Sequence, residues 1–209
     1  MRIVHFGHSC LLLETGSARL LFDPGTYSAG FEHLTGLDAV LITHQHPDHV
    51  DAGKLPALLS ANPQAQLVVD PGTAGMLDLP VQIARPGDVL ELAGASVHAV
   101  GGQHALIHPE IPLVRNTGYI VDGGAFYHPG DALFVPEQAI DVLGLPTDAP
   151  WLKSAEAIDF LRLVKPRIAV PIHQGVLATP EIWYRQFTNL APAGTTVEVL
   201  PTDAEPADF

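Results

Sequence analysis

Short apolar runs separated by glycine and proline turns dominate the start of the chain. Runs of strand length bounded by such turns predict β-strands at residues 3–6, 10–14, 20–23 and 39–43. Between residues 50 and 60 the apolar positions recur at helical spacing and predict a helix. Further on, the same patterns predict strands at 66–69, 89–92, 96–100, 118–121, 125–127, 168–170 and 196–200, and helices at 154–164 and 180–189. Residues 201–209 are acidic and contain prolines, and we expect a flexible tail there.

The order of these elements favours a mixed α/β (α+β) fold. A run of strands, one helix, more strands and then alternating helices and strands can form two mixed sheets packed face to face with helices outside. At 209 residues and 47% hydrophobic composition, the chain is long and apolar enough to bury a sizeable core. We therefore expect a single domain over residues 1–209.

Charge and composition restrict the kinds of partner that the chain is expected to bind. The chain has 23 Asp and Glu against 10 Lys and Arg, and the resulting net charge of −13 disfavours binding to long nucleic acid. No apolar run approaches the roughly 20 residues needed to cross a bilayer, and no secretory signal precedes the first strand, so we expect a cytoplasmic protein without a membrane partner. The lone cysteine, Cys10, excludes an intrachain disulfide and lies in a strand pattern typical of a buried, inert thiol.

The segment from His44 to His49 carries the clearest chemistry. It reads His-Gln-His-Pro-Asp-His and directly follows the apolar strand at 39–43. Residues two apart in extended backbone point the same way, so His44 and His46 can bind one divalent ion, and Pro47 keeps the backbone extended there. Asp48 and His49 are displaced along the chain and can reach a second ion. A polar turn with solvated histidines is the alternative, but three histidines in six positions at a strand end favour metal binding.

Three further strand ends each offer one metal-binding side chain next to a glycine or proline. His104 follows the strand at 96–100, Asp131 follows the strand at 125–127, and His173 follows the strand at 168–170. For His104 there are two local competitors, His98 and His108. Four groups in one loop rarely complete two coordination spheres, so these strand ends predict a dinuclear site.

The motif His44-x-His46-x-Asp48-His49 followed by His104, Asp131 and His173 resembles that of metallo-β-lactamase-fold hydrolases. Gly7-His8-Ser9, Phe22-Asp23-Pro24 and Tyr127-His128-Pro129-Gly130-Asp131 resemble the small subgroup related to ascorbate-6-phosphate lactonases. The resemblance covers residues 3 to about 200 and implies a four-layer αββα sandwich. It implies His44, His46 and His104 on the first ion, Asp48, His49 and His173 on the second, and Asp131 bridging both.

Other residues are expected near this site in supporting roles. In the subgroup, His8 matches a position near the active site. It either contacts the substrate or the ligands there, or it has only a packing role. The resemblance implies that Asp23 buttresses the ligand loop. We expect His128 to support the ligands, and the apolar loop at 105–115 to form a substrate wall. His108 lies in that loop, and Arg115 or Lys153 can contact an anion.

The expected function is hydrolysis of a small ester, lactone or phosphoester. Two divalent ions, zinc first and manganese or iron as alternatives, would lower the pKa of a bridging water, and the resulting hydroxide would attack the substrate. Asp48 and Asp131 are the expected catalytic residues, and Asp48 can orient that hydroxide. An iron-dependent oxidoreductase or a ribonuclease-like phosphodiesterase of the same fold is the alternative, and a homo-oligomer is left open. Substrate choice is expected to lie in the loops at 105–115 and 144–153.

Overall fold

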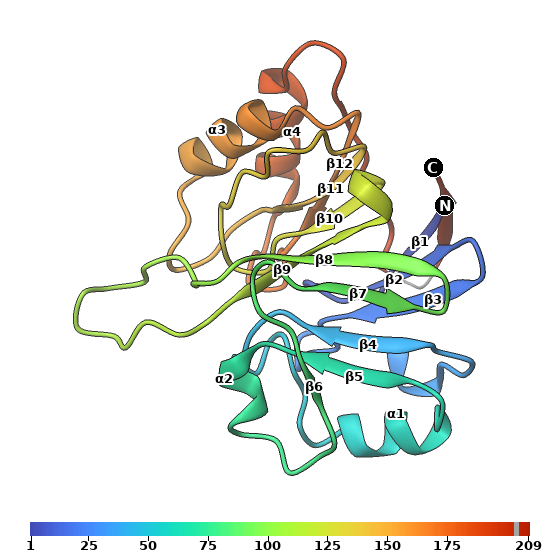
Figure 1. The fold of residues 1–209 in the computed structure, drawn as a ribbon. Coiled ribbons are helices and arrows are strands. Elements are labelled where there is room, and N and C mark those ends of the chain that lie inside the picture. Colours follow the sequence, from blue (N-terminus) through green and yellow to red (C-terminus); the bar gives the residue numbers. More distant parts are fainter. Residues whose placement is uncertain (203–204) are drawn as a thin grey trace.

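The computed structural model describes residues 1–202 and 205–209, which form two seven-stranded mixed sheets (Figure 1). In spatial order the first sheet contains β14 (Pro206–Asp208), β1 (Arg2–His5), β2 (Leu11–Thr15), β3 (Ala18–Phe22), β4 (Ala39–Ile42), β5 (Gln66–Val69) and β6 (Gln82–Ile83). The second contains β13 (Thr196–Val197), β12 (Ile168–Ile172), β11 (Val142–Pro146), β10 (Phe126–His128), β9 (Thr117–Val121), β8 (Ala95–Gly101) and β7 (Val89–Leu92).

The helices lie on the outer faces of the two sheets (Figure 1). They are α1 (Leu55–Ala61), α2 (Pro71–Ala74), α3 (Ser154–Val164) and α4 (Glu181–Leu190), with 3₁₀ turns η1 (Phe31–His33) and η2 (Asp122–Gly124). The predicted four-layer αββα sandwich is therefore confirmed. None of the helices in the described part of the chain has the length and apolar character needed to span a bilayer.

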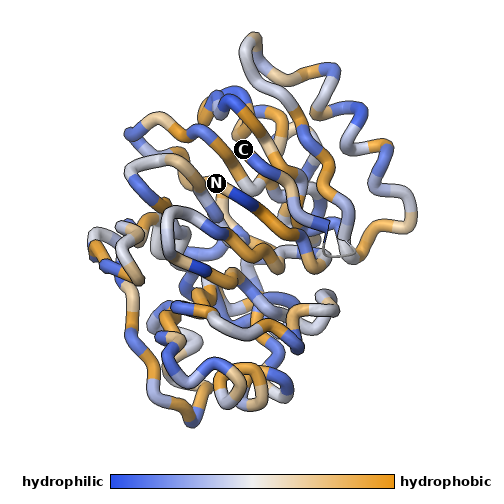
Figure 2. The backbone as a smooth tube through the Cα atoms, turned by 90° about the vertical axis from the view of Figure 1, so that its right-hand side faces the viewer, coloured by the Kyte–Doolittle hydropathy of each residue, from blue (hydrophilic) through white to orange (hydrophobic). Residues whose placement is uncertain are grey.

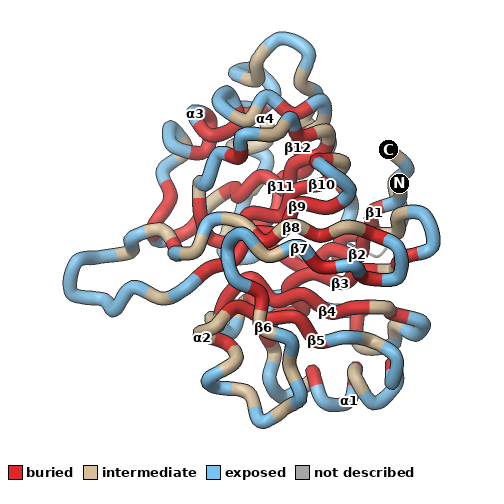
Figure 3. The backbone as a smooth tube through the Cα atoms, in the orientation of Figure 1, coloured by how far each residue is buried: buried red, intermediate tan, exposed pale blue. Residues whose placement is uncertain are grey.

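The core forms because strand residues alternate between two apolar layers. In β4, Ala39 and Leu41 join the cluster between the sheets, whereas Val40 and Ile42 pack with the cluster that includes α1. A strand covered on both faces reads as a continuous apolar run, as this one does. Aromatic side chains join the sheets, with the Phe22 ring 5.5 Å from that of Phe126. Figure 2 shows the apolar residues along the central strands, and Figure 3 shows that these strands are buried.

Several boundaries differ from the sequence expectations for identifiable reasons. The predicted helix at 50–60 begins only at Leu55, because the Asp51 carboxylate accepts hydrogen bonds from the N–H groups of Gly53 and Lys54 and holds a turn there. Strand β11 was not predicted, since its sequence contains Gly144 and Pro146, yet it lies fully buried between β10 and β12.

The expectation of a flexible tail at 201–209 was wrong for its last residues. Strand β14 pairs antiparallel with β1, and the Phe209 N–H donates to the Met1 carbonyl at 2.8 Å. The two termini consequently lie side by side (Figure 1). This pairing satisfies backbone groups at the edge strand β1. The acidic, proline-containing composition of residues 201–209 did not indicate it. Residues 203 and 204 of that expected tail lie outside the described residues.

Candidate metal centre

The loop that follows β4 is fixed at its base by the second sheet. The Tyr119 hydroxyl donates to the Ile42 carbonyl at 2.9 Å, and the Thr117 N–H donates to the Thr43 carbonyl at 2.8 Å. Beyond Pro47 the chain turns tightly, because the N–H of His49 bonds back to the carbonyl of His46. This turn lets four polar side chains leave one short loop toward the edge of the sandwich.

Two groups of side chains come together at this edge, each with ligand-type atoms all within 4.8 Å of one another. The first cluster is His44, His46, His104 and Asp131. The second cluster is His8, Asp48, His49 and His173. Both are buried apart from His46 and Asp48, which are half-buried. The seven residues singled out as ligands thus converge, and His8 joins them.

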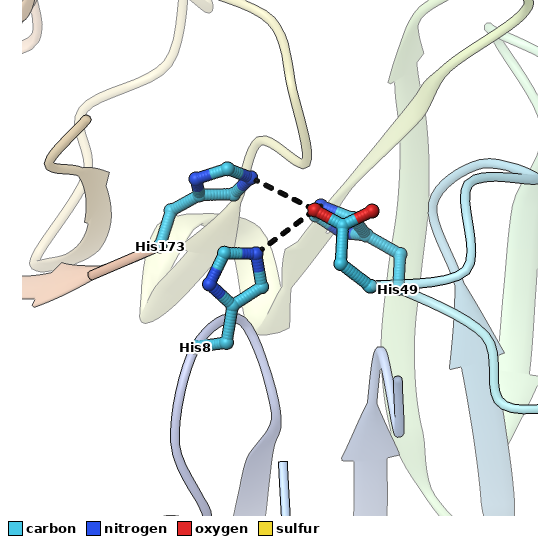
Figure 4. A group of neighbouring side chains, drawn as sticks. His8, His49 and His173 are labelled. Atoms are coloured by element: carbon cyan, nitrogen blue, oxygen red, sulfur yellow. Dashed lines mark hydrogen bonds and ion pairs between the residues drawn. The ribbon is translucent and has the colours of Figure 1, made fainter. Parts of the chain in front are cut away.

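In the second cluster, two imidazoles from different loops face one carboxylate. Figure 4 shows the rings of His8 and His173 pointing to the same place beside His49. There the Asp48 Oδ2 atom lies 3.0 Å from Nε2 of His8 and 3.6 Å from Nε2 of His173. These side chains come from the β1–β2 loop, the loop after β4 and the end of β12.

The Asp131 carboxylate spans both clusters. Its Oδ1 atom lies 3.1 Å from Nε2 of His49 and 3.2 Å from Nε2 of His173, in the second cluster. Its Oδ2 atom lies 3.3 Å from Nε2 of His104 and 3.9 Å from Nε2 of His44, in the first cluster. With one oxygen toward each group, this carboxylate is placed to bridge two ions.

Asp23 orients the loop that carries the histidines. Its carboxylate is fully buried, accepts from the N–H and hydroxyl of Thr43 at 2.8 and 2.7 Å, and lies 2.7 Å from Nδ1 of His49. A carboxylate on one imidazole nitrogen fixes the ring so that the other nitrogen, Nε2, faces the cluster. The geometry agrees with the buttressing role expected for Asp23.

Backbone strain concentrates at the same edge. Asp23, His8 and His173 all have positive φ, at 44°, 49° and 62°, a region that non-glycine residues rarely adopt. Such strain costs about 1–3 kcal/mol per residue and persists where the surroundings over-determine the conformation. Here it aims three side chains at one place.

His8 supports Asp48 rather than offering a free nitrogen. The Gly175 N–H donates to its Nδ1 atom at 3.1 Å, so the neutral ring carries its proton on Nε2 and donates it to Asp48. Burial lowers the pKa of His8 to about 4, which keeps the ring neutral. Burial alone would raise the pKa of Asp48, but the hydrogen bond from His8 and the nearby imidazoles lower it to about 2.

The buried carboxylate of Asp131 is held in its ionised form. Burial alone would raise its pKa, but His49 and His173 hold that pKa well below the usual range. Burial likewise favours neutral His49, yet the Asp131 and Asp23 carboxylates raise its pKa well above the usual value. In contrast, burial and the neighbouring imidazoles lower the pKa of His44. The centre therefore combines a neutral imidazole at His44, a positively charged one at His49 and the permanent negative charge of Asp131.

The chemistry of these donors fits divalent cations. Four buried atoms face only other atoms of the clusters and have no hydrogen-bond partner elsewhere in the described residues, namely Nε2 of His49, His104 and His173 and Oδ1 of Asp131. Leaving a buried polar group unpaired costs about 1–3 kcal/mol. Nitrogen and oxygen donors converging without a partner are what zinc and related ions bind.

The segment between β11 and α3 supports both clusters. The Trp151 indole N–H donates to Oδ2 of Asp131 at 2.8 Å, and the Asp148 carbonyl accepts from Nδ1 of His173 at 2.7 Å. On the other side of Asp131, the Asn116 carboxamide accepts its backbone N–H at 3.0 Å and donates to Pro129. Neither Trp151 nor Asn116 was predicted from the sequence. The only signal that could have identified Trp151 is its position in the tract at 144–153, since the chain has just two tryptophans.

Of the other residues considered near the site, His108, His98 and Arg115 lie away from the clusters. His108 is exposed in the loop at 105–115, where its Nδ1 accepts the Glu110 N–H, so it does not compete with His104. His98 lies in β8 and belongs to neither cluster. His128 bonds to the Ser9 carbonyl and accepts the Gly130 N–H, which shapes the turn leading to Asp131. Arg115 lines a separate pocket.

Two other expectations concern residues near the centre. The loop at 105–115 lies over the first cluster, since a narrow space is lined by His46, His104 and the apolar loop residues Ile107, Ile111 and Leu113. This geometry agrees with a substrate wall. Cys10 is fully buried, and burial raises the pKa of its thiol well above the usual value, as expected for an inert thiol.

Comparison with known families settles the class of this centre. Residues 2–173 match the family model described as the beta-lactamase superfamily domain. The chain belongs to the metallo-β-lactamase superfamily. Within it, the Opitutus terrae UPF0173 metal-dependent hydrolase is 31% identical over 204 residues, covering 83% of this chain and 84% of that protein. The chain is thus a metal-dependent hydrolase of this superfamily.

Other relatives agree over most of the chain. The Mycobacterium tuberculosis protein Rv0786c is 52% identical over 210 residues, covering 98% of both chains. Among solved structures, the metallo hydrolase Igni18 from Ignicoccus hospitalis has a TM-score of 0.74 at 23% identity and covers 100% of this chain and 98% of its own. The diiron β-hydroxylase CmlA from Streptomyces venezuelae has a TM-score of 0.76 at 15% identity, covering 100% of this chain and 54% of CmlA. These two likenesses establish the metallo-β-lactamase fold alone.

Replacing Trp151 with phenylalanine is expected to weaken metal binding by this hydrolase roughly 10-fold or more, as is typical when a partner that orients a ligand is lost. The ring is kept, so the effect comes from losing the hydrogen bond to Asp131. Affinity is measured by competition with a chromogenic chelator. Trp183→Phe is the matched control, because the Trp183 N–H has no partner in the described residues. Equal affinities in the two variants would refute a role for the Trp151 hydrogen bond.

Proposed function

We propose that the two clusters bind two divalent metal ions and that the enzyme hydrolyses a small ester, lactone or phosphoester. His44, His46 and His104 would hold the first ion, Asp48, His49 and His173 the second, and Asp131 would bridge them. The observation that carries this assignment is the Asp131 carboxylate, with Oδ1 toward one group of imidazoles and Oδ2 toward the other. Zinc is the first choice for this set of nitrogen and oxygen donors, with manganese or iron as alternatives.

The reaction follows from this placement of charge. When bound, two such ions would lower the pKa of a coordinated water and would polarise the group under attack. Asp48 stays ionised at neutral pH, with His8 donating to it, and can orient the attacking water. Asp23 and the Asp148 carbonyl keep the imidazoles of His49 and His173 aimed inward. The loop at 105–115 limits access to the first cluster.

A turnover screen tests the proposal. The purified protein is loaded with zinc, manganese or iron(II) and assayed against panels of lactones, carboxylic esters and phosphodiesters. We expect turnover that a chelator removes and the same metal restores. Turnover that persists unchanged after complete chelation would contradict the proposal. Oxygen uptake with oxidation of the substrate, in place of hydrolysis, would instead favour the iron-dependent oxidoreductase.

Removing metal is also expected to destabilise the protein. An ion that binds only the folded state at 100 times its dissociation constant adds about 2.7 kcal/mol, which corresponds to about 5–10 °C in Tm for a chain of this size. Differential scanning calorimetry of chelated and zinc-loaded protein measures the shift. The same comparison on Asp131→Ala serves as control and is expected to give little shift. An identical Tm for both states of the wild type would argue against binding at these buried clusters.

A further inference from the structure

A pocket of about 660 Å³ lies against the loops that carry His104 and Asp131. Gln103 and Ala105, on either side of His104, line it, and so does Ala132, which follows Asp131. Arg115 also lines it and immediately precedes Asn116, which holds the Asp131 backbone. The pocket thus lies beside the candidate metal centre, and its lining includes sequence neighbours of the clustered residues.

Two guanidinium groups line this pocket without an acidic partner. Neither Arg85 nor Arg115 has a carboxylate within 4.0 Å or a side-chain hydrogen bond among residues 1–202 and 205–209, and the pocket lining contains no Asp or Glu. By contrast, Arg2, Arg19 and Arg167 are all paired with carboxylates. In a chain of net charge −13, two unpaired arginines in one pocket are an uncommon concentration of positive charge.

Hydrogen bonds fix the position of the turn at 85–88, which carries Arg85. The Arg85 N–H donates to the Asp88 carboxylate, and the Gly87 N–H donates to the carbonyl of Ala99 in β8. The turn packs closely on Gly102, where a Cβ would lie 3.0 Å from Cγ of Pro86. Gly102 also has a φ of 126°, which side chains rarely adopt. The absence of a side chain at Gly102 therefore brings Arg85 against the loop that carries His104.

Part of the pocket lining is apolar. Leu133 and Phe134 belong to it, and Phe134 is 42% exposed. A ligand complementary to the whole lining carries an anionic group for the guanidinium groups and an apolar group for Leu133 and Phe134.

We infer that this pocket binds an anionic group, a phosphate or a carboxylate, on an amphiphilic small-molecule substrate, through Arg85 and Arg115. The inference rests on the proposed hydrolase function, because it places the anion away from the bond that is cleaved. It assigns the substrate class as anions with an apolar portion. Arg85 was not identified from the sequence, whereas Arg115 was considered as an anion contact.

Binding of defined probes tests the inference. Phenyl phosphate, benzoate and neutral benzyl alcohol are titrated into the zinc-loaded full-length protein by calorimetry, and again after chelation to remove binding at the metals. Phenyl phosphate or benzoate is expected to bind in both states, and benzyl alcohol far more weakly. The anion that binds with the higher affinity indicates whether the pocket prefers a phosphate or a carboxylate. Arg85→Gln and Arg115→Gln are each expected to weaken anion binding roughly 10-fold or more, since each removes charge-assisted hydrogen bonds to the anion.

Arg185→Gln is the matched control, because Arg185 is also exposed and unpaired in the described residues but lies on α4, outside the pocket. It removes the same charge and is expected to leave anion affinity unchanged. Equal affinity in the double variant Arg85→Gln/Arg115→Gln and in Arg185→Gln would overturn the inference, as would equal binding of benzyl alcohol. Arginine-dependent binding without any hydrolysis would uphold the pocket and count against the proposed function instead.

Discussion

Replacing Asp131 with alanine is expected to abolish hydrolysis and to reduce metal content below one ion per chain. Both carboxylate oxygens are engaged, Oδ1 toward His49 and His173 and Oδ2 toward His104. Losing this residue leaves three imidazoles without their shared negative charge. Because loss of a partner that merely orients a ligand costs about 10–100-fold, we expect activity to fall by more than about 100-fold.

The measurement combines elemental analysis with turnover on the substrate found by screening. His46→Ala is the informative comparison, because His46 belongs to the first cluster only and its loss is expected to remove one ion of two while also abolishing turnover. Asp159→Ala, on the exposed face of α3, controls for removal of a carboxylate and is expected to match the wild type. Hydrolysis that persists in both Asp131→Ala and His46→Ala would contradict the metal-dependent mechanism.

Replacing Gly25 with alanine is expected to dislodge the second cluster without touching any proposed ligand. A Cβ on Gly25 would lie 1.9 Å from the carbonyl oxygen of Asp48 and 2.5 Å from the nitrogen of His49, both backbone atoms. No side chain can move aside to relieve this contact. The two segments are also bonded, with Thr26 N–H donating to the Pro47 carbonyl at 2.8 Å, so the loop must shift as a whole.

We expect Gly25→Ala to lower the free energy of unfolding by about 1–3 kcal/mol or more, as overpacking does, and to lower metal content. Thermal unfolding and elemental analysis measure the two effects. Gly75→Ala is the matched control, since a Cβ there meets its nearest neighbour at an ordinary 3.4 Å. A Gly25→Ala variant with wild-type Tm and full metal content would contradict the close packing of this loop on Pro24–Gly25.

The candidate metal ligands could be predicted because their signals are local. The loop from His44 to His49 follows a strand that reads as one apolar run, and His104, Asp131 and His173 each follow a strand next to a glycine or proline. Sequence alone does not bring distant strand ends together. The order of the motifs, which resembles the metallo-β-lactamase superfamily, supplied that step, and the clusters in the structure agree with it.

Residues that act through long-range contacts could not be predicted in this way. The bond from Trp151 to Asp131 depends on β11, which was missed because glycine and proline are poor strand formers in isolation. Within a sheet, burial between β10 and β12 overrides that local preference. Arg85 belongs to the pocket only because the turn at 85–88 packs on Gly102.

By itself, the sequence indicated which residues are candidate metal ligands and which strands present them, because residue type and spacing act over a few neighbouring positions. Its resemblance to metallo-β-lactamase-fold hydrolases implied the sandwich fold. Only the tertiary structure decided how the donors are oriented, with Asp23, His8, Trp151 and Asn116 each bonded to a partner that is distant in the chain. Such contacts form only where two sheets pack together, because packing brings into contact residues whose separation along the chain carries no periodic signal.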